Sequence, residues 1–226
     1  MKVHILVEGA SERVFFDRWA PRAFPDHEFV VRPYQGKGKL PRDPAARPDP
    51  RHRGLLDLLP ATLRAYGATS AMAADGVLVV VDLDDENREE LERRLAAIAQ
   101  ASAPLRVVMR LAIEELEAFY LGDLRALETA FPDADMLTAR DYVADSIVGT
   151  AELFGKVIGD DGLRKVMWAD CMGARLGTTP SGSRSPSFKA LHAGIRELVS
   201  VAAQPKRSRK KHWKTRHSSQ RKKGRE

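Results

Sequence analysis

Cysteine is nearly absent from the sequence: Cys171 is the only one among 226 residues, so no intramolecular disulfide can form. Such scarcity suits a reducing compartment, and we expect a soluble, cytoplasmic protein. Long apolar runs are also missing, and the N-terminal run at 3–7 stops at Glu8. It is too short for a signal peptide or a membrane span, so we expect no membrane partner. No G-x-x-x-x-G-K-[ST] phosphate-binding loop occurs, so any ATP hydrolysis would come from a partner protein.

Charge is plentiful but unevenly distributed. The segment 205–226 holds six Lys, five Arg and one Glu, a net charge of +10, whereas the whole chain carries +6. Residues 1–204 therefore carry a net charge of −4. The segment has too few apolar residues to fold, so we predict a disordered basic tail attached to a mildly acidic body.

The basic tail has the composition of a polyanion-binding segment. Its cations attract phosphates, and Trp213 could stack on an unpaired base, so we expect it to bind nucleic acid. The alternative is a tail that only improves solubility. The expected contact residues are Lys206, Arg207, Arg209, Lys210, Lys211, Trp213 and Lys214.

Strands and helices are predicted to alternate over the first half of the chain. Short apolar runs predict strands at 2–7, 28–34, 77–81 and 104–112. A helical pattern follows each run, which predicts an α/β fold with a Rossmann-like parallel sheet and helices on both faces. We place this domain at residues 1–122, a small helical region at 123–204 and the tail at 205–226.

Local signals refine this outline. Ser11 is a candidate N-cap for the first helix, and Pro60 is expected to break or kink the second. The Pro-, Gly- and Arg-rich segment 36–53 predicts a mobile basic loop. The run 114–131 predicts a single helix.

Acidic residues follow three of the predicted strands. Glu8 ends the first strand, DLDDEN (82–87) ends the most apolar one, and Glu114, Glu115 and Glu117 follow the fourth. Ligands of open α/β sheets bind outside the carboxyl ends of the strands, so these acids should share one edge. Their repulsion would be costly unless a cation neutralised it, and carboxylate oxygens suit Mg²⁺ or Mn²⁺.

The D-x-D spacing allows two interpretations. If the strand continues through residue 84, Asp82 and Asp84 face the same side as metal ligands while Leu83 turns into the core. Alternatively, the acids are only first-turn residues of the next helix, where the helix dipole favours them.

These residues resemble the TOPRIM domain of topoisomerases, primases and OLD-type nucleases. The resemblance rests on VEGASE (7–12) before a helix and VVVDLDD (79–85) at the end of a later strand, and it covers roughly residues 1–122. In that domain a Glu after the first strand and a D-x-D after the third hold divalent metal for phosphodiester chemistry. The resemblance implies that Glu8, Asp82 and Asp84 bind Mg²⁺ or Mn²⁺ and are catalytic.

A closer resemblance is to a bacterial TOPRIM-like family of unassigned function. It rests on QGKGKL (35–40), RLAIEELEAFYLGDL (110–124) and SRSPSFKALHAGIREL (183–198). Within the second motif it implies that Glu117 joins the metal ligands. Phe119 stands where the family usually has Trp, a change that should preserve packing, and an Arg/Pro-rich insertion follows Leu40.

Several further residues are weighed beside this site. Glu12 lies one helical turn after Glu8 and is expected to be a surface acid or a capping partner rather than a ligand. Lys37 and Lys39 could reach the same edge and bind phosphate, the alternative being solvated lysines. Ser187 is a candidate N-cap for the last helix.

The leading hypothesis is a Mg²⁺- or Mn²⁺-dependent nuclease, for which phage defence is a candidate setting. The alternative, from another functional class, is an effector or regulatory subunit of a defence or toxin system that is inactive without an ATPase partner. A haloacid-dehalogenase-like phosphatase fits poorly, because its D-x-D belongs on the first strand of the domain.

Overall fold

A computed structural model describes residues 1–69, 75–84, 86–160 and 162–200. The strands are β1 Lys2–Val7, β2 Glu28–Pro33, β3 Gly76–Asp82 and β4 Arg106–Ala112. The helices are α1 Ala10–Ala23, α2 Leu55–Ala68, α3 Arg88–Ala101, α4 Glu117–Gly122, α5 Leu124–Ala130, α6 Met136–Asp141, α7 Thr150–Ile158, α8 Lys165–Arg175 and α9 Pro186–Ser200, with a short 3-10 helix η2 at Pro180–Gly182. The predicted tail, 205–226, lies outside the described residues.

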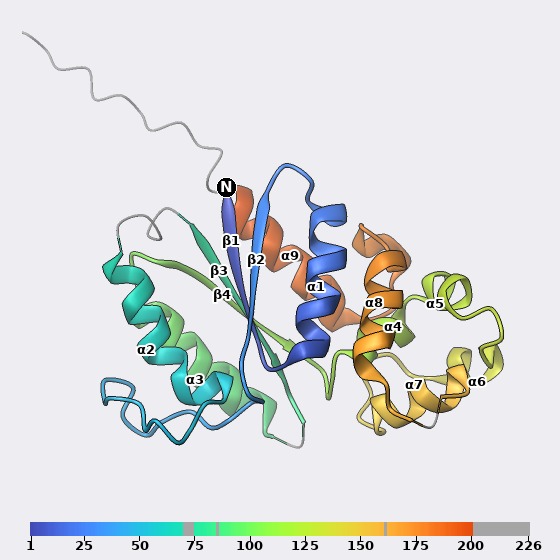
Figure 1. Cartoon of the computed structure of the whole chain (residues 1–226), viewed down its shortest axis with the longest axis horizontal. Helices are drawn as coiled ribbons and strands as arrows, with labels where there is room; N and C mark the ends of the chain where they lie inside the picture. Colours follow the sequence, from blue (N-terminus) through green and yellow to red (C-terminus); the bar gives the residue numbers. More distant parts are fainter. Residues whose placement is uncertain (70–74, 85, 161, 201–226) are drawn as a thin grey trace, which may run out of the picture.

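The four strands form one parallel sheet in the order β2-β1-β3-β4. Helices cover both of its faces, so the predicted α/β fold is confirmed (Figure 1). From β1 the chain moves to one side to form β2 and then to the other side to form β3. The direction of the crossover therefore reverses between β1 and β3, which is the topological switch point of the sheet.

The strand sequences alternate between two hydrophobic cores. In β3, Val77, Val79 and Val81 pack under α2 and α3, whereas Leu78 and Val80 face the core that α1 and α9 cover. Successive side chains of a strand point to opposite faces, so a strand buried on both faces is apolar throughout. This explains the five apolar residues at 77–81.

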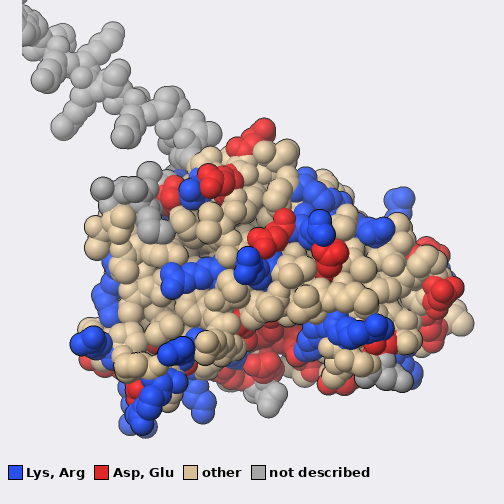
Figure 2. Space-filling view, viewed as in Figure 1, with Lys and Arg blue, Asp and Glu red and all other residues tan. Residues whose placement is uncertain are grey.

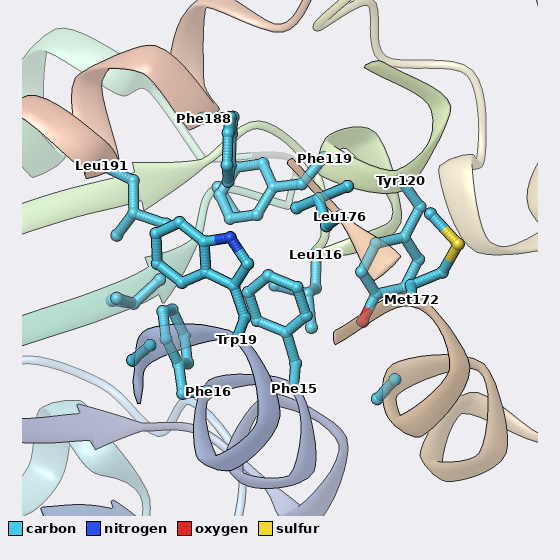
Figure 3. Close-up of a cluster of buried hydrophobic side chains, with 14 of the residues drawn as sticks. Phe15, Phe16, Trp19, Leu116, Phe119, Tyr120, Met172, Leu176, Phe188 and Leu191 are labelled. Carbon is cyan, nitrogen blue, oxygen red and sulfur yellow. The ribbon is translucent and has the colours of Figure 1, made fainter. Parts of the chain in front are cut away.

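The helical region after residue 122 packs against the sheet domain and shares its core. Helix α8 lies along α1, and α9 crosses back to cover β4 and β3 (Figure 1). Aromatic side chains from α1, α4 and α9 meet in the cluster of Figure 3. The ring centroid of Phe188 lies 5.3 Å from that of Trp19 and 5.6 Å from that of Phe119. The core is therefore continuous across the boundary drawn from the sequence, and Phe119 is fully buried, as expected.

Several local predictions were wrong. Gly9, not Ser11, is the N-cap of α1, and the Ser11 hydroxyl donates to Glu12 instead. Helix α2 continues through Pro60, so the break expected there as one alternative does not occur. The single helix predicted over 114–131 is divided at Asp123, whose carboxylate accepts from the N–H of Ala126 and caps α5.

The start of α9 is held by the carboxylate of Asp145, for which no sequence pattern indicated a role. Asp145 accepts hydrogen bonds from the Ser187 N–H at 2.6 Å and from the hydroxyls of Ser185 and Ser187. The Ser185 hydroxyl in turn accepts from the Phe188 N–H, so Ser185 rather than Ser187 occupies the capping position.

Among the described residues, no helix combines the length and apolarity that crossing a bilayer requires.

Candidate metal centre

Glu8 and Asp82 meet at the switch point of the sheet. Glu8 follows β1 directly and Asp82 is the last residue of β3, the neighbouring strand. The Glu8 Oε1 accepts a hydrogen bond from the backbone N–H of Asp82 at 2.9 Å. The structure therefore brings together two of the acids that the sequence placed at strand ends, in the crevice where parallel sheets bind ligands.

Two further carboxylates approach the same point from helices. Glu12 lies in the first turn of α1 and Glu117 begins α4. Their residues are only 8% and 2% exposed, and Glu8 is 9% exposed. The expectation that Glu12 is a surface acid was wrong, because the helix turns it inward. We call Glu8, Glu12, Asp82 and Glu117 the carboxylate cluster.

Burial and mutual repulsion raise the pKa values within the carboxylate cluster. Desolvation raises the pKa of Glu8 to about 7, against a hydrogen bond from Asp82 and the charge of Lys37, which lower it. Desolvation likewise raises the pKa of Glu117 to about 7, opposed by Lys165. The pKa of Asp82 is raised well above its ordinary value by burial and then by Glu8, Glu12 and Glu117. These acids are costly to ionise together in the absence of a cation.

Asp84 is placed differently from Asp82. Strand β3 ends at Asp82, and Asp84 adopts a left-handed conformation with φ of 49°. Leu83 turns into the core, as predicted, but Asp84 is turned toward Lys37 rather than repeating the direction of a continuing strand. Its charge still contributes to the raised pKa values of Glu8 and Asp82, so it remains at the edge of the site.

Lys37 is a built-in cation beside the carboxylate cluster. Its ammonium group lies 3.0 Å from Asp84, 2.8 Å from Glu86 and 3.0 Å from the carbonyl oxygen of Leu83, to which it donates. The side chain is only 12% exposed, so the alternative of a freely solvated lysine was wrong. The first turn of the 36–53 loop is thus fixed to the end of β3.

A second lysine approaches from the opposite side. Lys165, the first residue of α8, donates to Glu115 at 2.7 Å, and its charge also acts on Glu117 and Asp82. Glu114 does not share a direction with Glu117: its carboxylate accepts from the N–H groups of Val148, Gly149 and Thr150 and caps α7. Glu115, which was expected to point elsewhere, pairs with Lys165, and its charge helps to raise the pKa of Glu117.

The donor set suits a hard divalent cation, although it is not preassembled. Among the described residues, no group of three or more Asp, Glu, His or Cys side chains has the spacing of a finished metal site. The carboxylate cluster nevertheless offers oxygen ligands whose repulsion a cation would relieve. The buried hydroxyl of Tyr120, which has no hydrogen-bond partner among the described residues, also lies near three of these carboxylates. Glu8, Asp82 and Glu117 are the residues that could hold Mg²⁺ or Mn²⁺, with Asp84 at the edge.

Basic side chains flank the acidic centre. Figure 2 shows Asp and Glu gathered below the sheet, with Lys and Arg on either side, over the 36–53 loop and over α8. A cavity of about 700 Å³ adjoins Asp84, and its cations include Lys37, Lys39, Arg42 and Arg94. Lys39 is exposed there, as a phosphate-binding residue requires. The seven predicted contacts of the tail, from Lys206 to Lys214, lie outside the described residues.

One family model matches residues 7–145, under the description of a domain of unknown function, DUF4276. The chain belongs to this family. No curated protein and no solved structure matches the chain significantly. The DUF4276 segment contains the whole carboxylate cluster and Lys37, whereas Lys165 and α9 lie beyond it.

Sequence reasoning missed three residues of this site. Glu12 lies one helical turn after Glu8, and this spacing could have placed its side chain at the site. It was instead predicted to lie at the surface. Tyr120 follows Glu117 by three residues, the spacing of one helical face. Lys165 had no local signal, because only the packing of α8 against α1 brings it to the site.

Proposed function

We propose that this protein is a Mg²⁺- or Mn²⁺-dependent phosphodiesterase acting on nucleic acid, most simply a TOPRIM-like nuclease. The observation that carries the proposal is the carboxylate cluster at the switch point between β1 and β3. Four acids from two strands and two helices converge there, and the pKa values of three of them are raised. Such an arrangement is unfavourable in an empty site and favourable around a cation.

The roles of the residues follow from their positions. Glu8, Asp82 and Glu117 would hold the metal, and Asp84, paired with Lys37, lies at the edge of the site. A divalent cation bound there supplies Lewis-acid stabilisation of charge on a phosphoryl oxygen. The raised pKa of Glu8 reflects the cost of its charged form while no cation lies beside it, which agrees with a role as metal ligand.

The surroundings favour a polyanionic substrate over a small phosphate ester. Lys37 lies on one side of the carboxylate cluster and Lys165 on the other, and the cavity beside Asp84 extends the basic surface through Lys39, Arg42 and Arg94. A nucleic-acid strand places successive phosphates along such a path, so one can lie at the acids while its neighbours contact the cations.

Cleavage assays test this proposal directly. Purified full-length protein should nick supercoiled plasmid or degrade single-stranded RNA in Mg²⁺ or Mn²⁺, and EDTA should stop it. Glu8→Gln and Asp82→Asn remove ligand charge with little change in shape, and each should lower the rate at least 100-fold. Glu92→Gln, an exposed acid that pairs with Arg88 on α3, is the matched control and should cleave normally.

The outcomes are distinct. Cleavage that survives in Glu8→Gln and Asp82→Asn contradicts the assigned centre. A folded protein that neither cleaves nor binds Mn²⁺ contradicts the metal-dependent function altogether.

A second candidate function is a subunit that acts only beside a partner such as an ATPase. The observation that favours it is a set of exposed apolar side chains between α6 and the start of α8, which a partner could cover. They are Leu137, Val143, Ile147, Val148, Leu163, Val166 and Met167. A protein that binds Mn²⁺ but cleaves nothing until a partner is added would support this candidate over an autonomous nuclease.

A further inference from the structure

The Tyr120 hydroxyl is a buried polar group that the fold leaves unpaired. Tyr120 is fully buried, and within the part of the chain that the structure describes its hydroxyl has no hydrogen-bond partner. An unpaired buried hydroxyl destabilises the folded state, whereas phenylalanine would fill nearly the same space without that cost. The surroundings of the hydroxyl therefore indicate what it is for.

The side chain lies beside the carboxylate cluster. Tyr120 follows Glu117 by three residues in α4, so the two share a helix face. Its ring also packs 5.6 Å from that of Phe15, which follows Glu12 by three residues in α1. In Figure 3 the hydroxyl is at the end of the ring that points away from Phe119 and Phe188. The oxygen lies on the side of Phe15 and Met172, which belong to α1 and α8.

The charges around the hydroxyl keep it protonated. Burial raises the pKa of the Tyr120 phenol well above its ordinary value, and Glu117, Glu12 and Asp82 raise it further. The phenol is therefore neutral throughout the physiological range and has a proton to donate. The nearest charged groups that could accept it are carboxylates.

We propose that Tyr120 is a positioning residue that donates a hydrogen bond to the Glu117 carboxylate when a divalent cation occupies the site. This inference rests on the proposed function, because it assigns a role only in the metal-bound state. Cation binding draws the carboxylates together, and a donor behind Glu117 fixes the rotamer that points its free oxygen at the ion. The hydroxyl is sealed from solvent, so it acts through Glu117 and does not touch substrate.

The test compares metal affinity with stability in the full-length Tyr120→Phe variant. Mn²⁺ binding is measured by titration calorimetry at pH 8, and the thermal midpoint is measured in EDTA. We expect the Kd for Mn²⁺ to rise at least 10-fold. We expect the thermal midpoint in EDTA to stay the same or rise, because the metal-free protein loses only an unpaired hydroxyl.

Tyr142→Phe is the matched control. The Tyr142 hydroxyl accepts a hydrogen bond from the Asp145 N–H at 3.1 Å and belongs to no part of the carboxylate cluster. Its removal should lower the thermal midpoint and leave the Kd for Mn²⁺ unchanged. Tyr120→Phe is thus expected to weaken Mn²⁺ binding without lowering the thermal midpoint. Tyr142→Phe is expected to lower the thermal midpoint without weakening Mn²⁺ binding.

Each contrary result has its own meaning. Equal Mn²⁺ affinity in Tyr120→Phe and the parent overturns the positioning role while leaving the metal centre intact. A lowered midpoint for Tyr120→Phe in EDTA also overturns it, because the hydroxyl would then be paired without metal. A parent protein that binds no Mn²⁺ overturns the proposed function itself.

Discussion

Glu117 combines near-complete burial with a pKa raised to about 7, mainly by desolvation. A carboxyl whose folded pKa exceeds its unfolded pKa binds protons more tightly in the folded state. Its contribution to stability is therefore full below about pH 4.5 and is lost as the pH rises through 7. The same direction holds for Glu8 and Asp82, so without metal the protein should lose stability between acidic and neutral pH.

Replacing Glu117 with Gln should remove its share of this pH dependence. We expect the free energy of unfolding in EDTA to rise by about 3 kcal/mol at pH 8 and to change little at pH 4. Urea denaturation at the two pH values measures the difference. Glu128→Gln, an exposed acid on α5, should show no such gain. A stability gain of equal size at both pH values would contradict an origin in ionisation.

The positions of individual side chains were predictable where chain direction alone decides them. The apolar runs before Glu8 and Asp82 predicted two strands of a parallel sheet. Both acids were therefore expected at the same edge of that sheet. Glu12 was harder, because a helical acid beside serine has the same local pattern at a surface and at a buried site. Lys37 was predicted to reach this edge, but its partners Asp84 and Glu86 were not, since they lie almost 50 residues away in the chain.

Among the elements, α7 depends on Glu114, one of the acids that were predicted to lie at the edge of the sheet near the metal site. Glu114 adopts a left-handed conformation with φ of 63°, and its carboxylate accepts three consecutive N–H groups around the start of the helix. An acid at this place satisfies unpaired donors and complements the helix dipole. Its role is structural, unlike that of Glu117 three residues later.

Glu114→Ala should therefore lower stability and leave the metal site unaffected. Loss of a capping carboxylate is expected to cost about 1–2 kcal/mol in the free energy of unfolding. Chemical denaturation measures this cost, and titration with Mn²⁺ should give the affinity of the parent protein. A loss of Mn²⁺ affinity as large as that in Glu117→Gln would place Glu114 among the ligands after all.

Strands and sheet faces were easier to predict than helix boundaries. The continuous apolar run at 77–81 follows from burial on both faces of a parallel sheet, which tolerates few other residues. Helix ends depend on contacts made over long distances. The break at Asp123 is fixed by a carboxylate that also accepts from the N–H of Gly177, and no local pattern reveals that partner.

For the molecule as a whole, charge separates an acidic centre from basic surroundings. Residues 1–204 are net negative, yet Lys and Arg lie on both sides of the carboxylate cluster (Figure 2), and the segment 205–226 carries +10. A protein of this kind should bind nucleic acid with an affinity that falls steeply with salt.

Neutralising the segment should weaken binding without disturbing the site. The variant replaces six cations with Gln: Lys206, Arg207, Arg209, Lys210, Lys211 and Lys214. For single-stranded nucleic acid, the slope of log K against log salt should become shallower by up to about 4. Fluorescence anisotropy at several salt concentrations measures it. Mn²⁺ affinity and the thermal midpoint serve as controls and should not change; an unaltered slope would assign binding to the body of the protein.

Helices α8 and α9 have a consequence for biosynthesis. A ribosome delivers the four strands well before residues 165–200, which supply Lys165 and the cover of β4 and β3. Until those residues emerge, α1 alone covers that face of the sheet, β3 and β4 lack their cover there, and the site lacks its second lysine. If the proposed function holds, a nascent chain is therefore expected to stay inactive until residue 200 has left the exit tunnel.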